Sequence, residues 1–452
     1  MTNSATKHSN TVLTPAHLGE LTTIIPPDMV DAALDDTFGR HHRTRRLPSP
    51  QVIYLLLAGV LFSDLGWRQV YNRLTASWAQ PPTPPAAASI SQAMRRVGPA
   101  PLRNLFDLLS GPATTRDDSI DRFAGRLVVA VDGTQIPVAD TDANRKTIPK
   151  PPAGANGQAG YPMIRVVALV ATGTRTIINA VCGPDRVSEV AYTHQLIKSL
   201  SPGMLLLGDR NFATRELYAA IIGQGADFLI RAKIGTRALK MPVEQRLADG
   251  SYLTVINDRL LRVIDARITI TTEQGPRVSC YRLVTSMIDV EEATAKALVE
   301  LYHQRWEVEV CYLELKSTLL DGRVLRGRYP QAVEQEVWAV LVLYQAIRIA
   351  MADSVLTVGI SPVRLSFSVA ISVARDQVVL GFIGSTDRGV VGFVGRIGLR
   401  LLDQVMPKRR VRTRIRVVKR AMSRYPARGR DVDRRTYPAT VETQVLTTTP
   451  PP

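Results

Sequence analysis

Cysteine is scarce in this sequence, and its scarcity argues against two kinds of structural site. The three cysteines, Cys182, Cys280 and Cys311, are scattered and form no Cys-x-x-Cys pair. Neither a disulfide framework nor a zinc site built on paired thiols is therefore expected. The pattern fits a protein of the reducing cytoplasm.

Long apolar runs are also missing. Residues 1–8 contain no apolar core of the kind found in secretory signals, and the longest early apolar run, Val52–Phe62, is too short to cross a bilayer. No internal repeat is present. We therefore expect a soluble, cytoplasmic protein that is neither exported nor inserted in a membrane.

Acidic residues are outnumbered, and the excess of basic residues is concentrated. Lys and Arg number 57 against 40 Asp and Glu, which gives a net charge of +17. Residues 396–435 hold 15 Lys and Arg against three Asp, and so supply +12 of that charge. Such a block indicates a solvated tail or a contact with a polyanion, and arginine suits phosphate recognition. Nucleic acid is the first partner to test, and an anionic membrane surface is the second.

Apolar spacing divides the chain into a helical part and an α/β part. Helical patterns dominate from residue 27 to about 110. Continuous apolar runs then predict strands, buried on both faces of a mixed sheet that helices cover, at residues 127–131, 163–171, 176–182, 204–207 and 226–232. Turn signals predict a β-rich insertion at 238–288, and helices return at 290–320 and 331–352.

Two arginines lie on a short predicted helix, Ser89–Gly98, that follows a proline-rich hinge. The helix has a serine as its N-cap, Arg95 and Arg96 near its end, and a glycine stop. It is either presented to DNA, as in helix-turn-helix modules, or an ordinary surface helix, and the sequence favours neither interpretation.

One face of the helix predicted near residue 305 carries an unusual set of side chains. At about 100° per residue, four of them fall within about 60° of one another. They are Tyr302, Arg305, Glu309 and Lys316. The alternative is a solvated face with an Arg305–Glu309 ion pair. Glu307 and Glu314 project elsewhere on the wheel, so we expect their removal to leave any chemistry of this face intact.

Two aspartates directly follow buried strands. Asp132 comes after residues 128–131, and Asp209 comes after 204–207 and Gly208. Sheets of this class commonly place their chemistry at such strand ends. The alternatives are structural: Asp132-Gly133 suits a two-residue hairpin turn, and Asp209 could belong to an ordinary loop.

With Glu309, the two aspartates form a set of three carboxylates that no His or Cys cluster accompanies. Hard oxygen ligands of this kind select Mg²⁺ or Mn²⁺. Two such ions about 4 Å apart can activate a water or a 3′-hydroxyl and stabilise the departing oxygen of a phosphodiester. Arg305 and Lys316 would then offset phosphate charge.

These residues resemble a known family, the DDE transposases of the insertion element 4 family. The family signature Tyr-x2-Arg-x3-Glu-x6-Lys is matched without a gap at residues 302–316. The resemblance extends to Val131-Asp132-Gly133, to Gly-Asp-Arg-x-Phe at residues 208–212, and to Arg45-Arg46-Leu47-Pro48. It spans roughly residues 25–350.

The resemblance implies a ribonuclease H-like catalytic domain with a β-rich insertion between the second aspartate and the glutamate. It also implies cut-and-paste movement of an insertion sequence: binding of terminal inverted repeats in double-stranded DNA, synapsis by a homodimer, strand cleavage and strand transfer. Some relatives stack a flipped base on a tryptophan of the insertion. Residues 213–300 contain no tryptophan and only four aromatic residues, which are Tyr218, Phe228, Tyr252 and Tyr281. The stacking residue is therefore unassigned.

We accordingly expect Asp132, Asp209 and Glu309 to bind metal, and two Mg²⁺ or Mn²⁺ ions are the cofactor implied. We expect Tyr302, Arg305 and Lys316 to contact DNA phosphates. Arg95, Arg96 and Arg210 are further expected DNA contacts. Alternative functions are a ribonuclease H-like nuclease or resolvase that cuts without joining, and an inactive DNA-binding protein. The expected site of action is the nucleoid.

The expected domains follow from these patterns. They are a disordered N-terminus (1–20), a helical DNA-binding domain (21–115), a catalytic domain in two pieces (120–235 and 289–355), the β-rich insertion (236–288), a helical region (356–395) and a basic tail (396–452).

Overall fold

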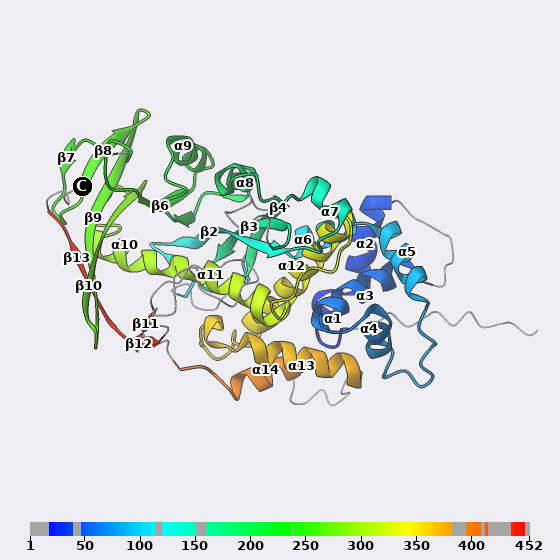
Figure 1. Ribbon diagram of the computed structural model, residues 1–452. Coiled ribbons are helices and arrows are strands. Elements are labelled where there is room, and N and C mark those ends of the chain that lie inside the picture. Colours follow the sequence, from blue (N-terminus) through cyan, green and yellow to red (C-terminus); the bar gives the residue numbers. More distant parts are fainter. Residues whose placement is uncertain are drawn as a thin grey trace, which may run out of the picture.

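The computed structural model describes residues 18–38, 47–113, 120–150, 160–236, 238–381, 395–407, 412–414 and 435–447. A large mixed sheet runs through the molecule in the strand order β4-β3-β2-β5-β6-β10-β9-β8-β7. In Figure 1 the helical N-terminal part lies at one end of this sheet and the β-rich insertion at the other. The expected fold class, a ribonuclease H-like mixed sheet with a helical N-terminal domain and a β-rich insertion, is confirmed.

Five strands form the core of the sheet. They are β2 (Arg126–Pro137), β3 (Met163–Ala171), β4 (Ile177–Pro184), β5 (Met204–Gly208) and β6 (Asp227–Ala232). β2, β3 and β4 are antiparallel neighbours, whereas β5 and β6 run parallel to β2. The short strand β1 (Arg122–Phe123) pairs with β2. Helix α7 (Asp142–Thr147) follows β2 in the chain.

Both faces of the core sheet are covered, which explains the continuous apolar runs in the sequence. Along β2, Val128 and Ala130 face the larger core cluster, and Val129 and Val131 face the smaller one. The smaller cluster contains residues of α8 (Glu189–Leu196), the 3₁₀ turn Ile197–Ser199 and α9 (Arg215–Gly223). The larger cluster includes the helices that carry the four-residue signature.

Six N-terminal helices pack against this larger core. They are α1 (Leu21–Ile24), α2 (Pro27–Phe38), α3 (Ser49–Leu61), α4 (Trp67–Leu74), α5 (Ala87–Val97) and α6 (Ala100–Leu109). The serine N-cap expected for α5 is wrong, because the helix begins at Ala87 and its cap residue is Ala86. The glycine stop is confirmed, since Gly98 has a φ of +66°. Arg45 and Arg46 lie outside the described residues, as do residues 1–17.

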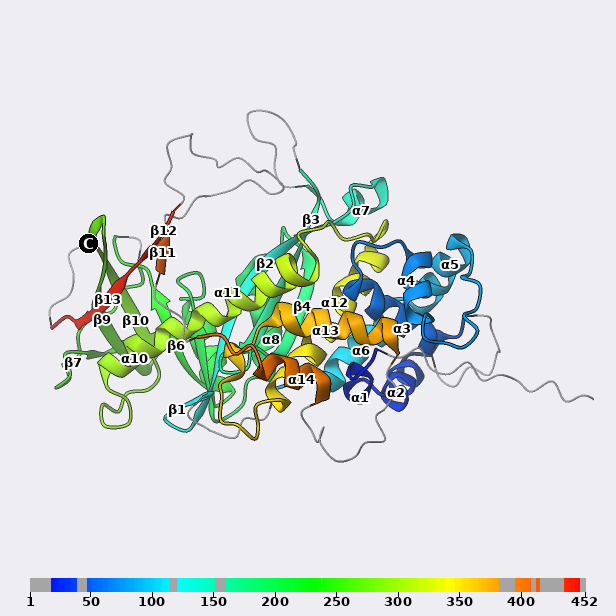
Figure 2. The same cartoon turned by 90° about the horizontal axis from the view of Figure 1, so that it is seen from below.

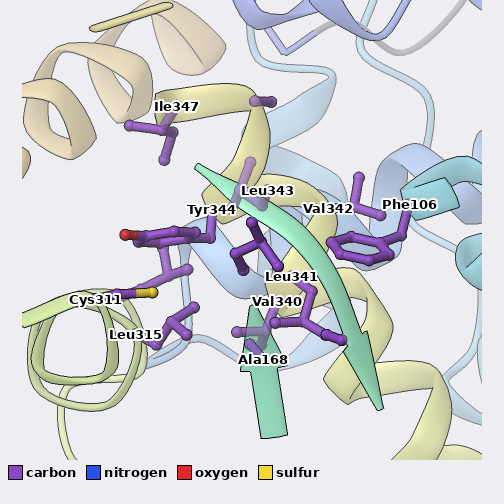
Figure 3. Packing of buried hydrophobic residues seen from close by; sticks show 14 of the residues in the cluster. Phe106, Ala168, Cys311, Leu315, Val340, Leu341, Val342, Leu343, Tyr344 and Ile347 are labelled. Carbon is purple, nitrogen blue, oxygen red and sulfur yellow. The ribbon is translucent and has the colours of Figure 1, made fainter. Parts of the chain in front are cut away.

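Helix α12 (Pro330–Asp353) joins the helical part to the sheet. Figure 3 shows Val342 of α12 beside Phe106 of α6, and Tyr344 near Cys311. α12 is buried along most of its length because it packs on both parts. After α12 come the 3₁₀ turn Pro362–Arg364, α13 (Phe367–Leu380) and α14 (Gly395–Leu402). In Figure 2, α13 and α14 lie beside α12 and the N-terminal helices.

The signature lies on a long helical stretch that departs from α-helical geometry twice. It consists of α10 (Ala295–Tyr302), a 3₁₀ turn (His303–Arg305), α11 (Trp306–Leu313) and a π-helical turn (Glu314–Leu319). The helix starts at Ala295, because the Thr294 hydroxyl accepts from the Ala297 N–H as an N-cap. None of the described helices is both long and apolar enough to cross a membrane.

The insertion continues the core sheet. Its strands are β7 (Gln245–Arg246), β8 (Tyr252–Ile256), β9 (Arg259–Thr272) and β10 (Gly275–Thr285). β10 pairs antiparallel with β6, so the insertion is hydrogen-bonded directly to the core. The predicted turns at Asn257-Asp258 and Gln274-Gly275 are confirmed, with Asn257, Asp258 and Gly275 all at positive φ.

The C-terminal segment returns to the insertion. Strand β12 (Thr436–Pro438) pairs with β11 (Arg412–Arg414), and β13 (Thr440–Val445) pairs antiparallel with β9. Val441 and Val445 pack against the larger core. Residues 408–411 and 415–434, which hold most of the basic block, lie outside the described residues. The segment expected to be a tail is thus attached to the fold at both ends.

Candidate active site

Asp132 and Asp209 come together through the parallel pairing of β2 and β5. The register pairs Ala130 with Leu207, and extending it by two residues places Asp132 level with Asp209. Ala130 and Leu207 both face the larger core cluster. Because side chains alternate along a strand, Asp132 points to the same face as Ala130. Leu205 and Leu207 also point to this face, and the same alternation favours this direction for Asp209.

Asp132 lies inside a strand, so its alternative interpretation as part of a hairpin turn is wrong. The side chain is 19% exposed, and its Oδ1 accepts from the Gly133 N–H at 2.8 Å. Burial raises the pKa of Asp132 to about 7, and the charges of Asp209 and Glu309 add to the rise, while the Gly133 N–H and Arg305 oppose it. Asp209 and Glu309 therefore both lie within electrostatic reach of Asp132.

Gly133 makes room for a fourth acid, Glu189, which the sequence analysis missed. A Cβ on Gly133 would lie 2.7 Å from the Cγ of Glu189. Burial raises the pKa of Glu189, and the charge of Asp209 adds to the rise, while Arg165, with Nη1 3.3 Å from Oε1, opposes it. In the sequence Glu189 looks like an ordinary acid in the first turn of a helix, so no signal distinguished it.

The turn after β5 is held by its own backbone. The Asp209 carboxylate accepts from the Asn211 N–H at 2.7 Å, and the Asp209 carbonyl accepts from the Phe212 N–H at 3.1 Å. Phe212 is fully buried and anchors the turn. The Gly-Asp-Arg-x-Phe pattern is thus a turn that fixes Asp209 and leaves Arg210 exposed.

Tyr302 supports the same turn from the helical side. Its hydroxyl donates to the Gly208 carbonyl at 3.2 Å, and its ring meets Tyr281 edge-on with centroids 6.2 Å apart. Tyr302 is only 6% exposed, and burial raises its pKa to about 12. This contact places Tyr302 next to Asp209 as a positioning residue. Its expected role as a DNA-phosphate contact stays a prediction.

Arg305 connects the third carboxylate to the first. Its Nη2 donates to Glu309 Oε1 at 2.9 Å, and its Nη1 lies 3.6 Å from Asp132 Oδ2. The Arg305 Nε is buried and has no hydrogen-bond partner among the residues that the structure describes. Lys316 lies on the π turn, half-buried, and burial lowers its pKa. Within the described residues no ion pair engages Lys316.

The three carboxylates are suitable ligands for a hard divalent cation, but in this structure they do not surround a single point. Asp132, Asp209 and Glu309 offer only oxygen ligands, as Mg²⁺ and Mn²⁺ prefer. Among the described residues, no three carboxylate, imidazole or thiol groups already lie close enough to hold an ion. Arg305 accounts for part of this, because its guanidinium lies between Asp132 and Glu309.

Glu307 and Glu314 turn away from the site, as the helical wheel predicted, and enter a buried ion network. Arg175 donates through Nε to Glu307 and through Nη1 to Glu314, the second bond at 3.0 Å. Arg348 and the Tyr344 hydroxyl donate to the other oxygen of Glu314. Arg175 occupies the turn between β3 and β4 with a φ of +57°. The network fastens the helix that carries Glu309 to the sheet and to α12.

The four aromatic residues between residues 213 and 300 are mostly buried. Tyr218 and Phe228 stack on each other with centroids 4.7 Å apart, and Tyr252 is also buried. Tyr281 is half-buried beneath Arg231. Trp306, on α11 beside the carboxylates, is 56% exposed.

Sequence comparison decides the family. The family described as Transposase DDE domain matches residues 123–345, and the one described as Insertion element 4 transposase N-terminal matches residues 15–107. The chain belongs to the insertion element 4 family of DDE transposases. This transposase is an enzyme that binds DNA, cleaves and transfers its strands, and depends on a divalent metal.

Its relatives include other transposases. It is 26% identical to "Transposase InsG for insertion sequence element IS4" of Escherichia coli (strain K12), over 90% of this chain and 93% of the relative. It is 27% identical to "Putative transposase InsZ" of the same strain, over 41% of this chain and 61% of the relative. A cryo-EM structure of the piggyBac transposase synaptic complex with hairpin DNA aligns over 84% of this chain and 81% of that chain, with a TM-score of 0.43 and 12% identity, too distant a likeness to inform this site.

Proposed function

We propose that this transposase moves an insertion sequence by a cut-and-paste route in the cytoplasm, at the nucleoid. In this proposal it binds the element's terminal inverted repeats in double-stranded DNA, and two copies bring the ends together as a homodimer. The observation that carries the proposal is that Asp209 and Glu309 both lie within electrostatic reach of Asp132, with Arg305 contacting Asp132 and Glu309.

The metal is proposed to be Mg²⁺ or Mn²⁺, as two ions held by Asp132, Asp209 and Glu309. When bound, such ions activate the attacking oxygen and stabilise the departing one. The protein's own part is positional: Tyr302 and the Asn211 N–H hold the turn of Asp209, and the Gly133 N–H orients Asp132.

Arg305 and Lys316 are proposed to bind the phosphates of the strand being cut. Arg305 is held by Asp132 and Glu309, and it becomes available to a phosphate when those carboxylates take up metal. Lys316 has no carboxylate partner among the described residues, and its ammonium is partly desolvated, which strengthens its attraction for an anion. Arg210, exposed next to Asp209, is proposed to contact the same DNA.

The test is a strand-transfer assay. Purified protein, Mg²⁺, a fragment carrying the element's ends and a plasmid target are incubated together, and joined products are expected. Cleavage without joining would indicate a nuclease or resolvase. Binding without cleavage would indicate an inactive DNA-binding protein.

Recognition of the ends is predicted to depend on Arg95 more than on Arg96. Arg95 is exposed, with its guanidinium 4.7 Å from the centroid of the Tyr329 ring, whereas Arg96 donates to the Leu47 carbonyl at 2.7 Å. Arg95→Ala should reduce the preference for terminal-repeat over random DNA by about 1–3 kcal/mol, the value of one base contact. Arg96→Ala should mainly lower the melting temperature. Competition binding and thermal melting measure the two effects, and an unchanged preference in both variants would place recognition elsewhere.

The basic block is predicted to supply affinity that does not depend on sequence. Truncation near Gly395 would also remove α14 and β13, so charge replacement is the better experiment. Replacing six Lys or Arg between residues 408 and 434 by Gln should lower the log–log salt slope of duplex binding by about 5 if each neutralises one phosphate. An equal slope would show that the block does not touch DNA.

A further inference from the structure

Glu189 approaches the carboxylates from the opposite side of the core sheet to the helix that carries Glu309. The buried residues of α8 belong to the smaller core cluster, whereas those of α11 belong to the larger one. Gly133 follows Asp132 on β2, so a side chain at Gly133 would point away from Asp132 and toward α8. The Glu189 carboxylate takes up that space, because a Cβ on Gly133 would lie 2.7 Å from its Oε1 and 2.8 Å from its Cδ. Glu189 therefore lies directly behind the part of β2 that carries Asp132.

The Glu189 carboxylate also reaches the turn that carries Asp209. The side-chain amide of Asn211 donates to the Glu189 carboxylate, and the backbone N–H of Asn211 donates to the Asp209 carboxylate at 2.7 Å. Burial raises the pKa of Glu189, and the negative charge of Asp209 adds to that rise, as expected for two neighbouring acids. Asn211 thus connects the two acids, one through its side chain and the other through its backbone.

Arg165 of β3 holds Glu189 in place and is shared with a second acid. Its Nη1 lies 3.3 Å from Glu189 Oε1, and its Nε donates to Asp185 at 3.0 Å. The Asp185 carboxylate also accepts from the side-chain amide of Gln135 on β2 at 2.6 Å. The side chains of Arg165, Asp185 and Glu189 are 15%, 24% and 25% exposed, so solvent screens their charges only in part. Because one arginine serves two carboxylates, part of this negative charge remains uncompensated beside Asp209.

We propose that Glu189 is a positioning residue of the metal site. Its contact with Gly133 fixes the strand that carries Asp132, and its bond with Asn211 fixes the turn after β5. Its charge also strengthens the attraction of the site for a divalent cation. Loss of an outer group that orients metal ligands typically lowers metal affinity by about 10- to 100-fold. The inference rests on the proposed function, because Asp132 and Asp209 are metal ligands only in that proposal.

The first experiment measures metal binding in the absence of any reaction. Calorimetry follows the binding of Mn²⁺ to the full-length wild type and to the Glu189→Gln and Asp209→Asn variants. Glu189→Gln keeps the size of the side chain but removes its charge, and it should weaken Mn²⁺ binding by about 10-fold or more. Its melting temperature without metal should stay close to that of the wild type. A lower melting temperature with unchanged Mn²⁺ affinity would show a merely structural role and overturn the proposal.

A matched control separates this effect from the loss of an acid at a helix start. Glu216 lies in the first turn of α9, as Glu189 does in α8, and it is exposed. Glu216→Gln removes the same kind of favourable interaction with the helix dipole, so it should bind Mn²⁺ as the wild type does. If Glu216→Gln weakens Mn²⁺ binding as much as Glu189→Gln does, general charge explains the effect and the positioning role is wrong.

The contact with Gly133 is tested by a double-mutant cycle. Gly133 does not have a positive φ, so Gly133→Ala adds no backbone strain and only places a methyl group where Glu189 lies. In the wild type this methyl group should displace Glu189 and weaken Mn²⁺ binding. In the Glu189→Ala variant the same change should cost little, because the space is then free. Additive losses would mean that the two residues act independently, contrary to the proposal.

Failure of this inference and failure of the proposed function give different results. If Mn²⁺ binding is lost in Asp209→Asn but unchanged in Glu189→Gln, the proposed metal ligands stand and the role of Glu189 is overturned. If Mn²⁺ binding is the same in the wild type and in both variants, the proposed metal ligands are wrong, and the role of Glu189 falls with them. If both variants lose affinity and the Gly133 cycle is non-additive, the inference is supported, whether or not strand transfer is observed.

Discussion

Asp132→Asn, Asp209→Asn and Glu309→Gln are each expected to lower the rate of strand cleavage by roughly 10³-fold or more, while the protein stays folded and still binds element ends. Asp209 and Glu309 both lie within electrostatic reach of Asp132, and these three carboxylates are the oxygen ligands proposed for the metal. A metal site that lacks one ligand no longer positions both reacting oxygens, and this costs several kcal/mol of transition-state stabilisation. Single-turnover cleavage of labelled ends measures the rate, and calorimetry with Mn²⁺ measures the loss of metal binding.

Glu300→Gln is the matched control for this experiment. Glu300 lies on α10, the helix that leads into the signature, and is exposed. The control variant should cleave at the wild-type rate. Cleavage at that rate by Glu309→Gln would instead show that the third acid is misassigned.

Without metal, the Asp132→Asn variant is expected to be slightly more stable than the wild type at pH 8. The pKa of Asp132 is raised to about 7, so the native state holds its proton more tightly than the unfolded chain does. Stability of the wild type therefore falls as the pH rises from about 4 to above 7, and the neutral amide removes this loss. Thermal melting at pH 5 and pH 8 should show the difference between variant and wild type growing with pH.

Glu314→Ala is expected to lower the free energy of unfolding by about 3–5 kcal/mol, because it breaks a buried ion network and leaves charges uncompensated. Glu314 is 7% exposed, and it neutralises Arg175 and Arg348, which are 4% and 0% exposed. The helical wheel predicts only that Glu314 faces away from the signature residues, and it does not reveal which groups the side chain meets in the core. Urea denaturation measures the loss.

Glu307→Ala is the milder comparison in the same network. Its side chain is 19% exposed, and Arg175 keeps its bond to Glu314 when Glu307 is removed. The expected loss is therefore smaller than for Glu314→Ala. Equal losses in the two variants would show that burial of Glu314 is not what makes it important.

Much of the active site was predictable because its signals are local. The runs before Asp132 and Asp209 are strands, and strands in parallel register bring their ends to one edge of the sheet. The helical spacing from Tyr302 to Glu309 survives one 3₁₀ turn. Lys316 lies on a π turn, whose wider winding no periodicity in the sequence reveals, so its place on the wheel was the least secure.

What the sequence did not reveal depends on contacts between distant segments. Glu189, on helix α8, reaches the site only because Gly133 on β2 lacks a Cβ. The partners of Glu314 come from the β3–β4 turn and from α12. Arg96 looks like a DNA contact until Leu47, far away in the sequence, accepts its hydrogen bond. Such pairings follow from tertiary packing, which composition and spacing do not encode.

Strand β13 has a consequence for how this protein is made. It pairs with β9, but everything from α10 to the basic block must be synthesised between the two. Until residues 440–445 leave the ribosome, one edge of β9 remains an open template for pairing with other chains. A transposase shortened by a premature stop codon upstream of Thr440 would therefore keep Asp132, Asp209 and Glu309 but be prone to aggregation and degradation. Only the full-length chain covers this edge of β9.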